Sequence, residues 1–322
     1  MNESNYIAPN PEIWTGRIDS ESNPQSYRWH QVVRCDSLSE LDHTNEFALL
    51  GFACDQGVAR NKGRVGAADG PDYLRSTVGS LSWQGNEQGF IDVGTIIPKD
   101  NNLEIAQESL SSAVKKLLSY QKNPIIIGGG HETAFGHYLG ISSFLREYQK
   151  DAKLGILNID AHFDLRSYEF GAHSGSPFLQ ALEDSNSKGA DLTYFVHGIN
   201  PHNNTQTLFE TAEEWGVEYS TNQEVLRGDK SAKLKLQRFL DDRSHIYLTI
   251  CLDVFDASIA PGVSAPAWHG IQLQHALDVI KLLKQSGKLV SMDICELNPV
   301  FDKDQKTAKA AGMLVAELFQ SV

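Results

Sequence analysis

The chain has 322 residues, enough for one large α/β domain or two average ones. Its 28 basic and 41 acidic residues give a formal net charge of −13, which argues against a surface that binds nucleic acid or an anionic membrane. No apolar run approaches the ~20 residues of a transmembrane helix, the N-terminus lacks signal-peptide features, and the four cysteines show no disulfide framework, so we expect a cytoplasmic protein.

Apolar runs alternate with amphipathic stretches along most of the chain. Strands are predicted at residues 47–53, 123–127, 154–159, 192–196, 246–252 and 289–295. Helices are predicted at residues 71–77, 103–120, 133–148, 205–215, 232–239, 273–285 and 307–319. Because strands that alternate with helices form a parallel sheet covered on both faces, we predict one three-layer α/β/α domain over residues 46–322. Residues 1–45 are expected to form an N-terminal arm that packs on this core.

The segment Asp160-Ala161-His162-Phe163-Asp164 carries the strongest functional signal. It follows the apolar run LGILNI, which is typical of a buried parallel strand. Alternate side chains of an extended chain share a face, so Asp160, His162 and Asp164 are expected to point the same way. Two carboxylates and one imidazole are suitable ligands for a divalent metal ion. The alternative is a polar strand end that happens to contain one histidine.

Polar side chains also follow three other predicted strands. His131 comes after a triple glycine that ends one strand, and Asp253 and Glu296 come directly after two more. Ligands bind at the carboxyl ends of the strands in open parallel sheets, so these groups are expected to meet at one edge. We therefore predict a metal centre there. For His131 the alternative is a hydrogen-bonded histidine of the core.

The candidate ligands are numerous enough for two metal ions. They comprise two imidazoles and three carboxylates, from His131, Asp160, His162, Asp164 and Asp253. Oxygen-rich ligation with some nitrogen suits Mn²⁺ better than it suits a thiolate-rich zinc site. Carboxylates can bridge two ions about 3.5–4 Å apart, and such a pair lowers the pKa of a water molecule. The implied chemistry is metal-assisted hydrolysis, with a single-metal site as the alternative.

Five ordered motifs connect the chain to a known superfamily. They are GGGHE at 128–132, DAHFDLR at 160–166, SGSPF at 174–178, DVFDASIAPGVSAP at 253–266 and ELNP at 296–299. In this order the chain resembles the ureohydrolases, which include arginases, agmatinases and formimidoylglutamases. The resemblance covers roughly residues 45–320 and implies an arginase-like α/β/α fold with a mainly parallel central sheet.

Within that superfamily the chain is most similar to the formimidoylglutamases. Glu132 stands after the first candidate histidine, where arginases usually have Ser. Arg166 lies two positions after Asp164, where arginases place an Asn that contacts the substrate. Ser174 precedes Gly175, where arginases and agmatinases carry a catalytic histidine.

The resemblance implies six metal-ligand positions, one of which departs from the common pattern. The implied ligands are His131, Asp160, His162, Asp164, Cys251 and Asp253. Position 251 is usually Asp, and a thiolate is a softer ligand that suits Mn²⁺ less well. Three readings of Cys251 stay open. It ligates a metal ion, it lies nearby and leaves the second site weaker, or the second metal ion is lost.

The resemblance also implies roles toward a substrate. Glu296 is expected to act in catalysis by accepting a hydrogen bond from a cationic formimidoyl nitrogen. The planar fork of Arg166 matches a substrate carboxylate, with a surface salt bridge as the alternative. Asn61 and Arg60 are weaker candidates for binding a second carboxylate.

We therefore expect an enzyme with two Mn²⁺ ions that cleaves N-formimidoyl-L-glutamate to L-glutamate and formamide in histidine degradation. The alternatives are an agmatinase, an arginase or another guanidine or amidine hydrolase. An alternative of another class is a non-catalytic binding protein on the same fold. The expected partner is a small-molecule substrate, without nucleic acid or membrane, and a homo-oligomer is left open.

Overall fold

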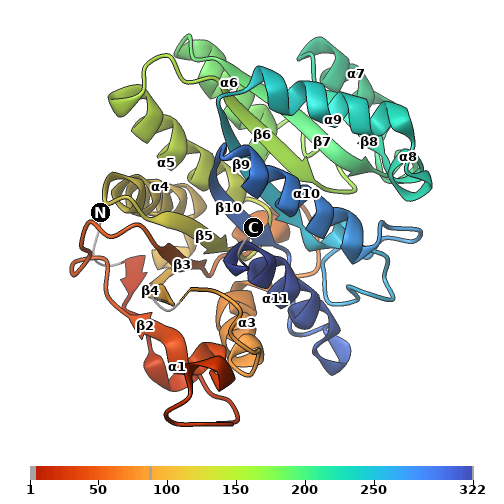
Figure 1. Cartoon of the computed structure of the whole chain (residues 1–322). Coiled ribbons are helices and arrows are strands. Elements are labelled where there is room, and N and C mark those ends of the chain that lie inside the picture. The colour runs from red at the N-terminus through yellow and green to blue at the C-terminus, as the bar shows by residue number, and fades with distance from the viewer. Residues whose placement is uncertain (1–4, 87–88, 321–322) are drawn as a thin grey trace.

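The computed structural model describes residues 5–86 and 89–320, and one mainly parallel β-sheet forms its centre (Figure 1). The strands are β1 (Tyr6–Ile7), β2 (Val33–Cys35), β3 (Phe47–Phe52), β4 (Phe90–Ile96), β5 (Asn123–Ile127), β6 (Leu154–Ile159), β7 (Leu192–Ile199), β8 (Glu218–Thr221), β9 (His245–Cys251) and β10 (Leu289–Cys295). Their spatial order is β1-β4-β3-β5-β10-β9-β6-β7-β8, and β2 also pairs with β4. Among the described pairs, β1 with β4 is antiparallel and the others are parallel.

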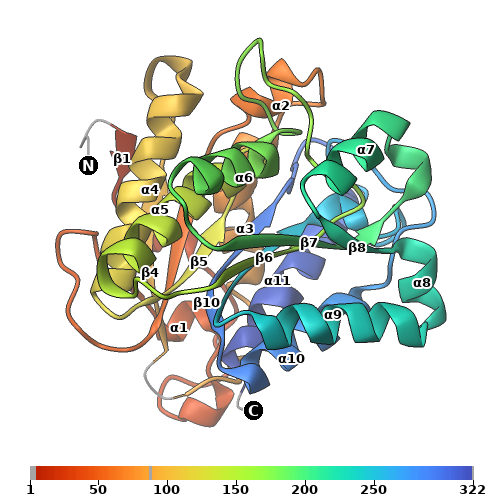
Figure 2. The same cartoon turned by 90° about the horizontal axis from the view of Figure 1, so that it is seen from above.

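Helices cover both faces of this sheet. They are α1 (Trp29–Val32), α2 (Gln56–Arg60), α3 (Gly70–Val78), α4 (Leu103–Ser119), α5 (Thr133–Tyr148), α6 (Pro177–Ser187), α7 (Gln206–Glu214), α8 (Asn222–Arg227), α9 (Lys230–Asp242), α10 (Leu273–Ser286) and α11 (Lys306–Phe319). Figure 2 shows α4, α5, α6 and α7 on one side of the sheet and α9, α10 and α11 on the other. Each face has its own buried apolar cluster. The predicted three-layer α/β/α architecture is therefore confirmed.

Burial of both faces explains why the central strands were predictable, whereas β4 was missed because it contains a buried charged residue. Every residue of β6 is buried, as expected for a continuous apolar run between two helical layers. In β4, Asp92 interrupts the apolar pattern. The Arg75 guanidinium binds the Asp92 carboxylate with two N···O distances of 2.9 Å. This buried ion pair compensates for the hydration that the Asp92 carboxylate loses on burial. No local sequence pattern predicts the pair, because the two residues lie on different elements.

The N-terminal residues from 5 to 45 extend the edge of the sheet. The strands β1 and β2 both pair with β4. The Trp14 indole N–H donates to Asp92 Oδ2 at 2.8 Å, and Trp29 packs against Phe90 with ring centroids 5.4 Å apart. The division into an arm over 1–45 and a domain over 46–322 stays a prediction.

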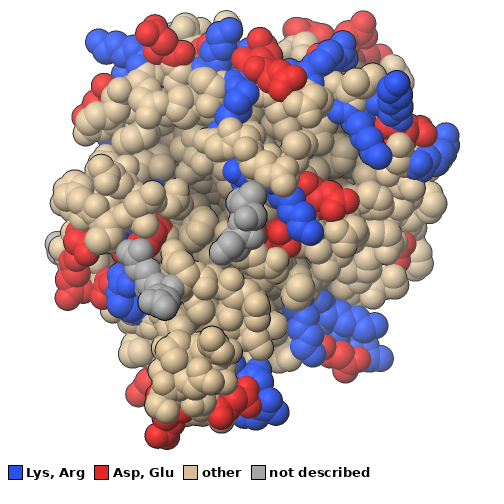
Figure 3. Space-filling view, viewed as in Figure 1, with Lys and Arg blue, Asp and Glu red and all other residues tan. Residues whose placement is uncertain are grey.

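The described surface is mixed in charge. On the face drawn in Figure 3, acidic and basic side chains alternate around the periphery, and its described residues form no continuous basic area. Among the described residues, no helix combines the length and the apolar character needed to cross a bilayer.

Candidate active site

Four neighbouring central strands deliver the candidate site residues to one edge of the sheet. The strands β5, β10, β9 and β6 are adjacent in that order. Their ends are level, because Ile294 pairs with Ile127 and Ile250, and Ile159 pairs with Ile250. The segments that follow these strands therefore start at the same height and face a common space.

A cavity of about 310 Å³ opens at this edge. Most of the sequence-predicted site residues line it, namely Asn61, His131, His162, Asp164, Arg166, Cys251, Asp253 and Glu296. Asp160 lies behind this lining and is fully buried. The structure thus brings together all six expected ligands and Glu296.

The backbone after β6 differs from the expected extended conformation. The strand ends at Ile159. Asp160 Oδ1 accepts the backbone N–H of His162 at 2.8 Å, and Asp164 has a φ of 50°. The prediction that alternation along a strand aligns Asp160, His162 and Asp164 is therefore wrong. A turn, and not a continued strand, aims these side chains into one space.

The donor atoms fit two divalent cations that share Asp160. Ligand atoms of His131, Asp160 and Cys251 lie within 4.8 Å of one another, and so do those of Asp160, His162 and Asp253. Asp253 Oδ1 is buried and has no hydrogen-bond partner among the described residues. Several buried carboxylates gathered in one space are costly unless cations neutralise them. This donor set, rich in oxygen and nitrogen, is suited to hard or borderline metal ions.

Both candidate histidines bind carboxylates in the structure. His131 Nδ1 lies 2.9 Å from Asp164 Oδ2 and 3.1 Å from Asp160 Oδ2, and His162 Nδ1 lies 3.3 Å from Asp253 Oδ2. Burial by itself would lower the pKa of each imidazole, but these carboxylates outweigh it and hold the pKa well above its ordinary value. These contacts therefore favour the protonated imidazoles, and a metal ion that bound there would compete with those protons.

A buried polar chain fixes the far side of the His131 ring. His131 Nε2 lies 3.0 Å from Thr249 Oγ1, and the Thr249 hydroxyl donates to Asp293 Oδ1 at 2.6 Å. Because a hydroxyl has one proton to donate, Thr249 must accept the Nε2–H of His131. His137 and Tyr247 bind the other oxygen of Asp293. This series of hydrogen bonds orients the His131 ring so that Nδ1 faces the cavity.

Glu296 presents one free oxygen to the cavity. Its Oε1 accepts the backbone N–H of His131 at 3.0 Å, while Oε2 is buried and has no partner among the described residues. Its backbone φ is 73°, a conformation that non-glycine residues seldom adopt. Burial, together with the nearby carboxylate of Asp253, raises the pKa of Glu296 to about 8.

Basic and polar groups form the outer wall of the cavity. Asn61 Nδ2 donates to Ser174 Oγ at 3.1 Å. A Cβ atom on Gly175 would lie 2.8 Å from Arg166 Cδ and 3.1 Å from Asn61 Nδ2, so the glycine gives these two side chains room. Arg166 and Lys62 line the cavity without an ion-pair partner among the described residues.

The structure does not bring Arg60 to the cavity. Its guanidinium binds the Glu104 carboxylate at 2.6 and 3.1 Å and the Ala172 carbonyl at 2.9 Å. The last turn of α2 directs Arg60 toward α4, while Asn61 follows on the cavity side. Arg64 does reach the cavity, but its guanidinium binds the carbonyls of Val263 and Ser264.

Sequence reasoning missed three residues that shape the site. Lys62 directly follows the predicted candidates Arg60 and Asn61, and this position was the available signal. Thr249 and Asp293 lie within apolar strand runs, where nothing in the local pattern distinguishes them from core residues.

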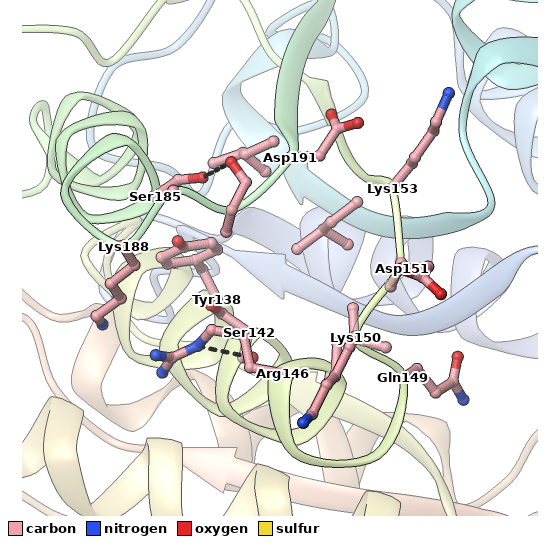
Figure 4. Close-up of a pocket in the computed structure, with 16 residues that line it drawn as sticks. Tyr138, Ser142, Arg146, Gln149, Lys150, Asp151, Lys153, Ser185, Lys188 and Asp191 are labelled. Carbon is pink, nitrogen blue, oxygen red and sulfur yellow. Dashed lines mark hydrogen bonds between the residues drawn. The ribbon is translucent and has the colours of Figure 1, made fainter.

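A second cavity, of about 620 Å³, lies at the opposite end of β6 and β7, beside α5 and α6. Figure 4 shows its labelled basic side chains, including Arg146, Lys150 and Lys153, pointing in different directions. They do not converge on a common point. This arrangement contrasts with the convergent groups at the carboxyl edge of the sheet.

A parallel sheet between two helical layers, with imidazoles and carboxylates gathered at its carboxyl edge, is typical of a class of metal-dependent hydrolases. Residues 45–320 match the model of the arginase family, and the chain belongs to that family. The fold agrees, since arginase from Bacillus subtilis superposes with a TM-score of 0.70 at 24% identity, over 86% of this chain and 99% of that one.

The curated relatives point to one branch of the family. The chain is 40% identical over 316 residues to a formimidoylglutamase of Geobacillus sp. (strain WCH70), covering 97% of this chain and 95% of that protein. It is 41% identical to a formimidoylglutamase of Ralstonia nicotianae, covering 98% and 97%. Trypanosoma cruzi formiminoglutamase with Mn²⁺ superposes with a TM-score of 0.78 at 25% identity, covering 91% and 97%. The predicted resemblance to formimidoylglutamases is confirmed.

Proposed function

We propose that this chain hydrolyses N-formimidoyl-L-glutamate to L-glutamate and formamide, a step in histidine degradation. The relatives named formimidoylglutamase, at about 40% identity over nearly the whole chain, support this substrate. The observation that carries the proposal is local. Arg166 and Lys62, both without ion-pair partners among the described residues, line the cavity that contains the candidate metal ligands. In a chain of net charge −13, two such cations in one cavity favour an anionic substrate.

We propose two Mn²⁺ ions as the cofactors. His131, Asp160 and Cys251 would hold one ion, and Asp160, His162 and Asp253 the other, with Asp164 beside His131. When bound, the pair supplies an acidified water and positive charge for a developing oxyanion. The Mn²⁺ in the Trypanosoma cruzi structure supports the choice of metal.

The side chains of this protein bind and orient the substrate. Glu296 Oε2 is the free acceptor for the formimidoyl N–H groups, because its other oxygen is occupied by the N–H of His131. Arg166 would clamp one carboxylate through two parallel hydrogen bonds, and Lys62 with Asn61 would hold the other. Between them they fix the distance from the formimidoyl carbon to both carboxylates, which a longer or uncharged substrate would not match.

Steady-state kinetics with the Mn²⁺-loaded protein test the proposal. We expect kcat/KM for N-formimidoyl-L-glutamate to exceed that for L-arginine, agmatine and 4-guanidinobutyrate by at least about a hundredfold. Faster turnover of any guanidine compound would reject the substrate. Fewer than one transition-metal ion per chain after loading, with no hydrolysis, would instead favour a non-catalytic binding protein.

Two further properties remain part of the proposal. The cysteines are free, and three of them are buried, including the candidate ligand Cys251, which supports a reducing, cytoplasmic location. Self-association into a homo-oligomer is proposed without a specific interface, and sedimentation measurements would test it.

A further inference from the structure

The turn after β5 sends two neighbouring side chains in different directions. His131 faces Asp160 and Asp164 in the candidate metal centre. Glu132 is fully buried and faces α2, where its Oε1 accepts the backbone N–H of Gly57 at 2.7 Å. This contact joins residues 75 positions apart in the sequence.

Two glycines provide the space that the Glu132 carboxylate occupies. A Cβ atom on Gly57 would lie 2.6 Å from Glu132 Cδ, and one on Gly130 would overlap Glu132 Oε2. Neither glycine has a positive φ. Their small size, and not their backbone freedom, is therefore what the Glu132 contact requires.

Glu132 takes the place of a local cap for α2. The N-cap residue Asp55 makes no side-chain capping bond, because its carboxylate accepts the N–H of Gly66 at 2.6 Å instead. An unpaired N–H at a buried helix start is costly, and Glu132 Oε1 supplies the missing acceptor. Gln107 holds Glu132 from the other side by donating to its carbonyl at 2.7 Å.

The position of α2 decides the position of the cavity wall. Asn61 donates its backbone N–H to the Gly57 carbonyl at 2.9 Å, and Gly63 donates to the Val58 carbonyl at 2.8 Å. Residues 61–64 follow directly and line the cavity. A shift of Gly57 would therefore move the wall relative to His131.

We infer that Glu132 is a positioning residue that couples the substrate-binding wall at residues 61–64 to the metal centre, through its contact with Gly57. Glu132 does not line the cavity that contains the candidate metal ligands, and it acts through α2. The inference has two consequences. The expected change in KM for the substrate rests on the proposed function, whereas the expected change in the stability of α2 does not.

Hydrogen exchange on the metal-free protein without substrate tests the effect on α2. In Glu132→Ala, the amides of residues 55–64 are expected to exchange at least about tenfold faster. In Glu132→Gln, the amide oxygen still accepts the Gly57 N–H, so exchange stays within about threefold of the original rate. Gly57→Ala disrupts the same contact from the α2 side and is expected to give the same increase in exchange. It replaces Glu132→Ala as the test if that variant folds poorly.

Glu224→Ala is the matched control. Glu224 accepts the Thr221 N–H at 2.7 Å at the start of α8, another short helix far from the cavity, so its loss should leave exchange at 55–64 unchanged. Unchanged exchange at 55–64 in both Glu132→Ala and Gly57→Ala, or an equal increase in the control, would overturn the inference.

The loaded enzyme supplies a second readout. Glu132→Ala should raise KM for N-formimidoyl-L-glutamate about tenfold, with kcat within about threefold and an unchanged Mn²⁺ content. A loss of Mn²⁺ or of kcat with unchanged KM would show that Glu132 acts on the metal centre and not on the wall. Because the exchange measurement needs no substrate, a wild-type protein without this activity would reject the proposed function and leave the coupling of Glu132 to α2 standing.

Discussion

His131 Nε2 lies 3.0 Å from the hydroxyl oxygen of Thr249, which is itself committed as a donor to a buried carboxylate. The hydroxyl therefore accepts from the imidazole, and the direction of one hydrogen bond sets which nitrogen of His131 faces the other candidate ligands. Groups that orient a ligand in this way affect metal affinity although they never touch the metal ion.

Replacing Thr249 with Val should weaken metal binding while the shape of the strand is kept. Valine removes the acceptor for the His131 Nε2–H, so we expect Mn²⁺ affinity to fall about 10–100-fold, measured by competition with a fluorescent chelator. Thr249→Ser keeps the hydroxyl and is the control, with affinity close to the original. Equal affinity in Val and Ser variants would show that the hydroxyl does not orient the ring.

The substitution Cys251→Asp should increase Mn²⁺ affinity. Burial, and then the nearby carboxylate of Asp160, raise the pKa of the Cys251 thiol well above its ordinary value. A metal ion must displace that proton before the sulfur can coordinate it, whereas an aspartate offers a harder oxygen ligand. Isothermal titration with Mn²⁺ measures the change, and Cys251→Ser separates the effect of charge from that of size. Lower affinity in the aspartate variant would mean that Cys251 does not occupy a ligand position.

Asp160→Ala should abolish hydrolysis and reduce bound metal to less than one ion per chain. Asp160 is the residue common to both ligand groups, so its removal takes one ligand from each site. Metal content by mass spectrometry and formamide release give independent measurements. Full activity in this variant would refute a centre built on a shared Asp160.

Arg166→Ala should raise KM by roughly ten- to a hundredfold with little change in kcat, because a carboxylate clamp binds the ground state and the transition state alike. Arg60→Ala provides the comparison. Its guanidinium is already occupied by Glu104, so we expect KM to change by less than about threefold. A larger effect at Arg60 than at Arg166 would exchange the roles of the two arginines.

The metal-free protein should become less stable as the pH rises from about 7 to about 8.5. Burial raises the pKa of Glu132 to about 7 and that of Glu296 to about 8. A carboxyl whose pKa is raised by folding stabilises the protein while it keeps its proton, and this stability falls from the ordinary pKa of 4.5 upward until the folded pKa is passed. Between about pH 7 and 8.5 the loss therefore comes mainly from Glu296, because most of the contribution of Glu132 is already gone at about pH 7. The raised pKa values of His131 and His162 act in the same direction. The window starts at about 7, where His197, whose burial lowers its pKa to about 4, is largely neutral in both states.

Thermal unfolding at the two pH values checks this prediction. Saturating Mn²⁺ should remove most of the loss, because a bound cation favours the ionised carboxylates. Glu296→Gln cannot ionise at that position and should show a smaller decrease in Tm for the metal-free protein. A metal-free Tm that is equal or higher at pH 8.5 would contradict the prediction.

The layered fold was predictable because its signals are local. The runs at β5, β6 and β10 are mostly apolar, as expected for strands buried on both faces, and their predicted bounds agree with the structure. The arginase-family motifs are also short, contiguous segments, and they predicted His131, Asp160 and Asp253 as metal ligands from the sequence alone.

What the sequence determined by itself was which chemical groups follow which strands. Only the tertiary structure decided how those groups meet, because their contacts join segments far apart in the chain. A turn at Asp160 stands where strand alternation was expected, and the ion pair with Glu104 holds Arg60 outside the cavity. Thr249 binds the His131 ring, which its apolar neighbours in the sequence did not indicate. Hydrogen-bond direction and competition between partners depend on three-dimensional neighbours, and no periodicity along the chain encodes them.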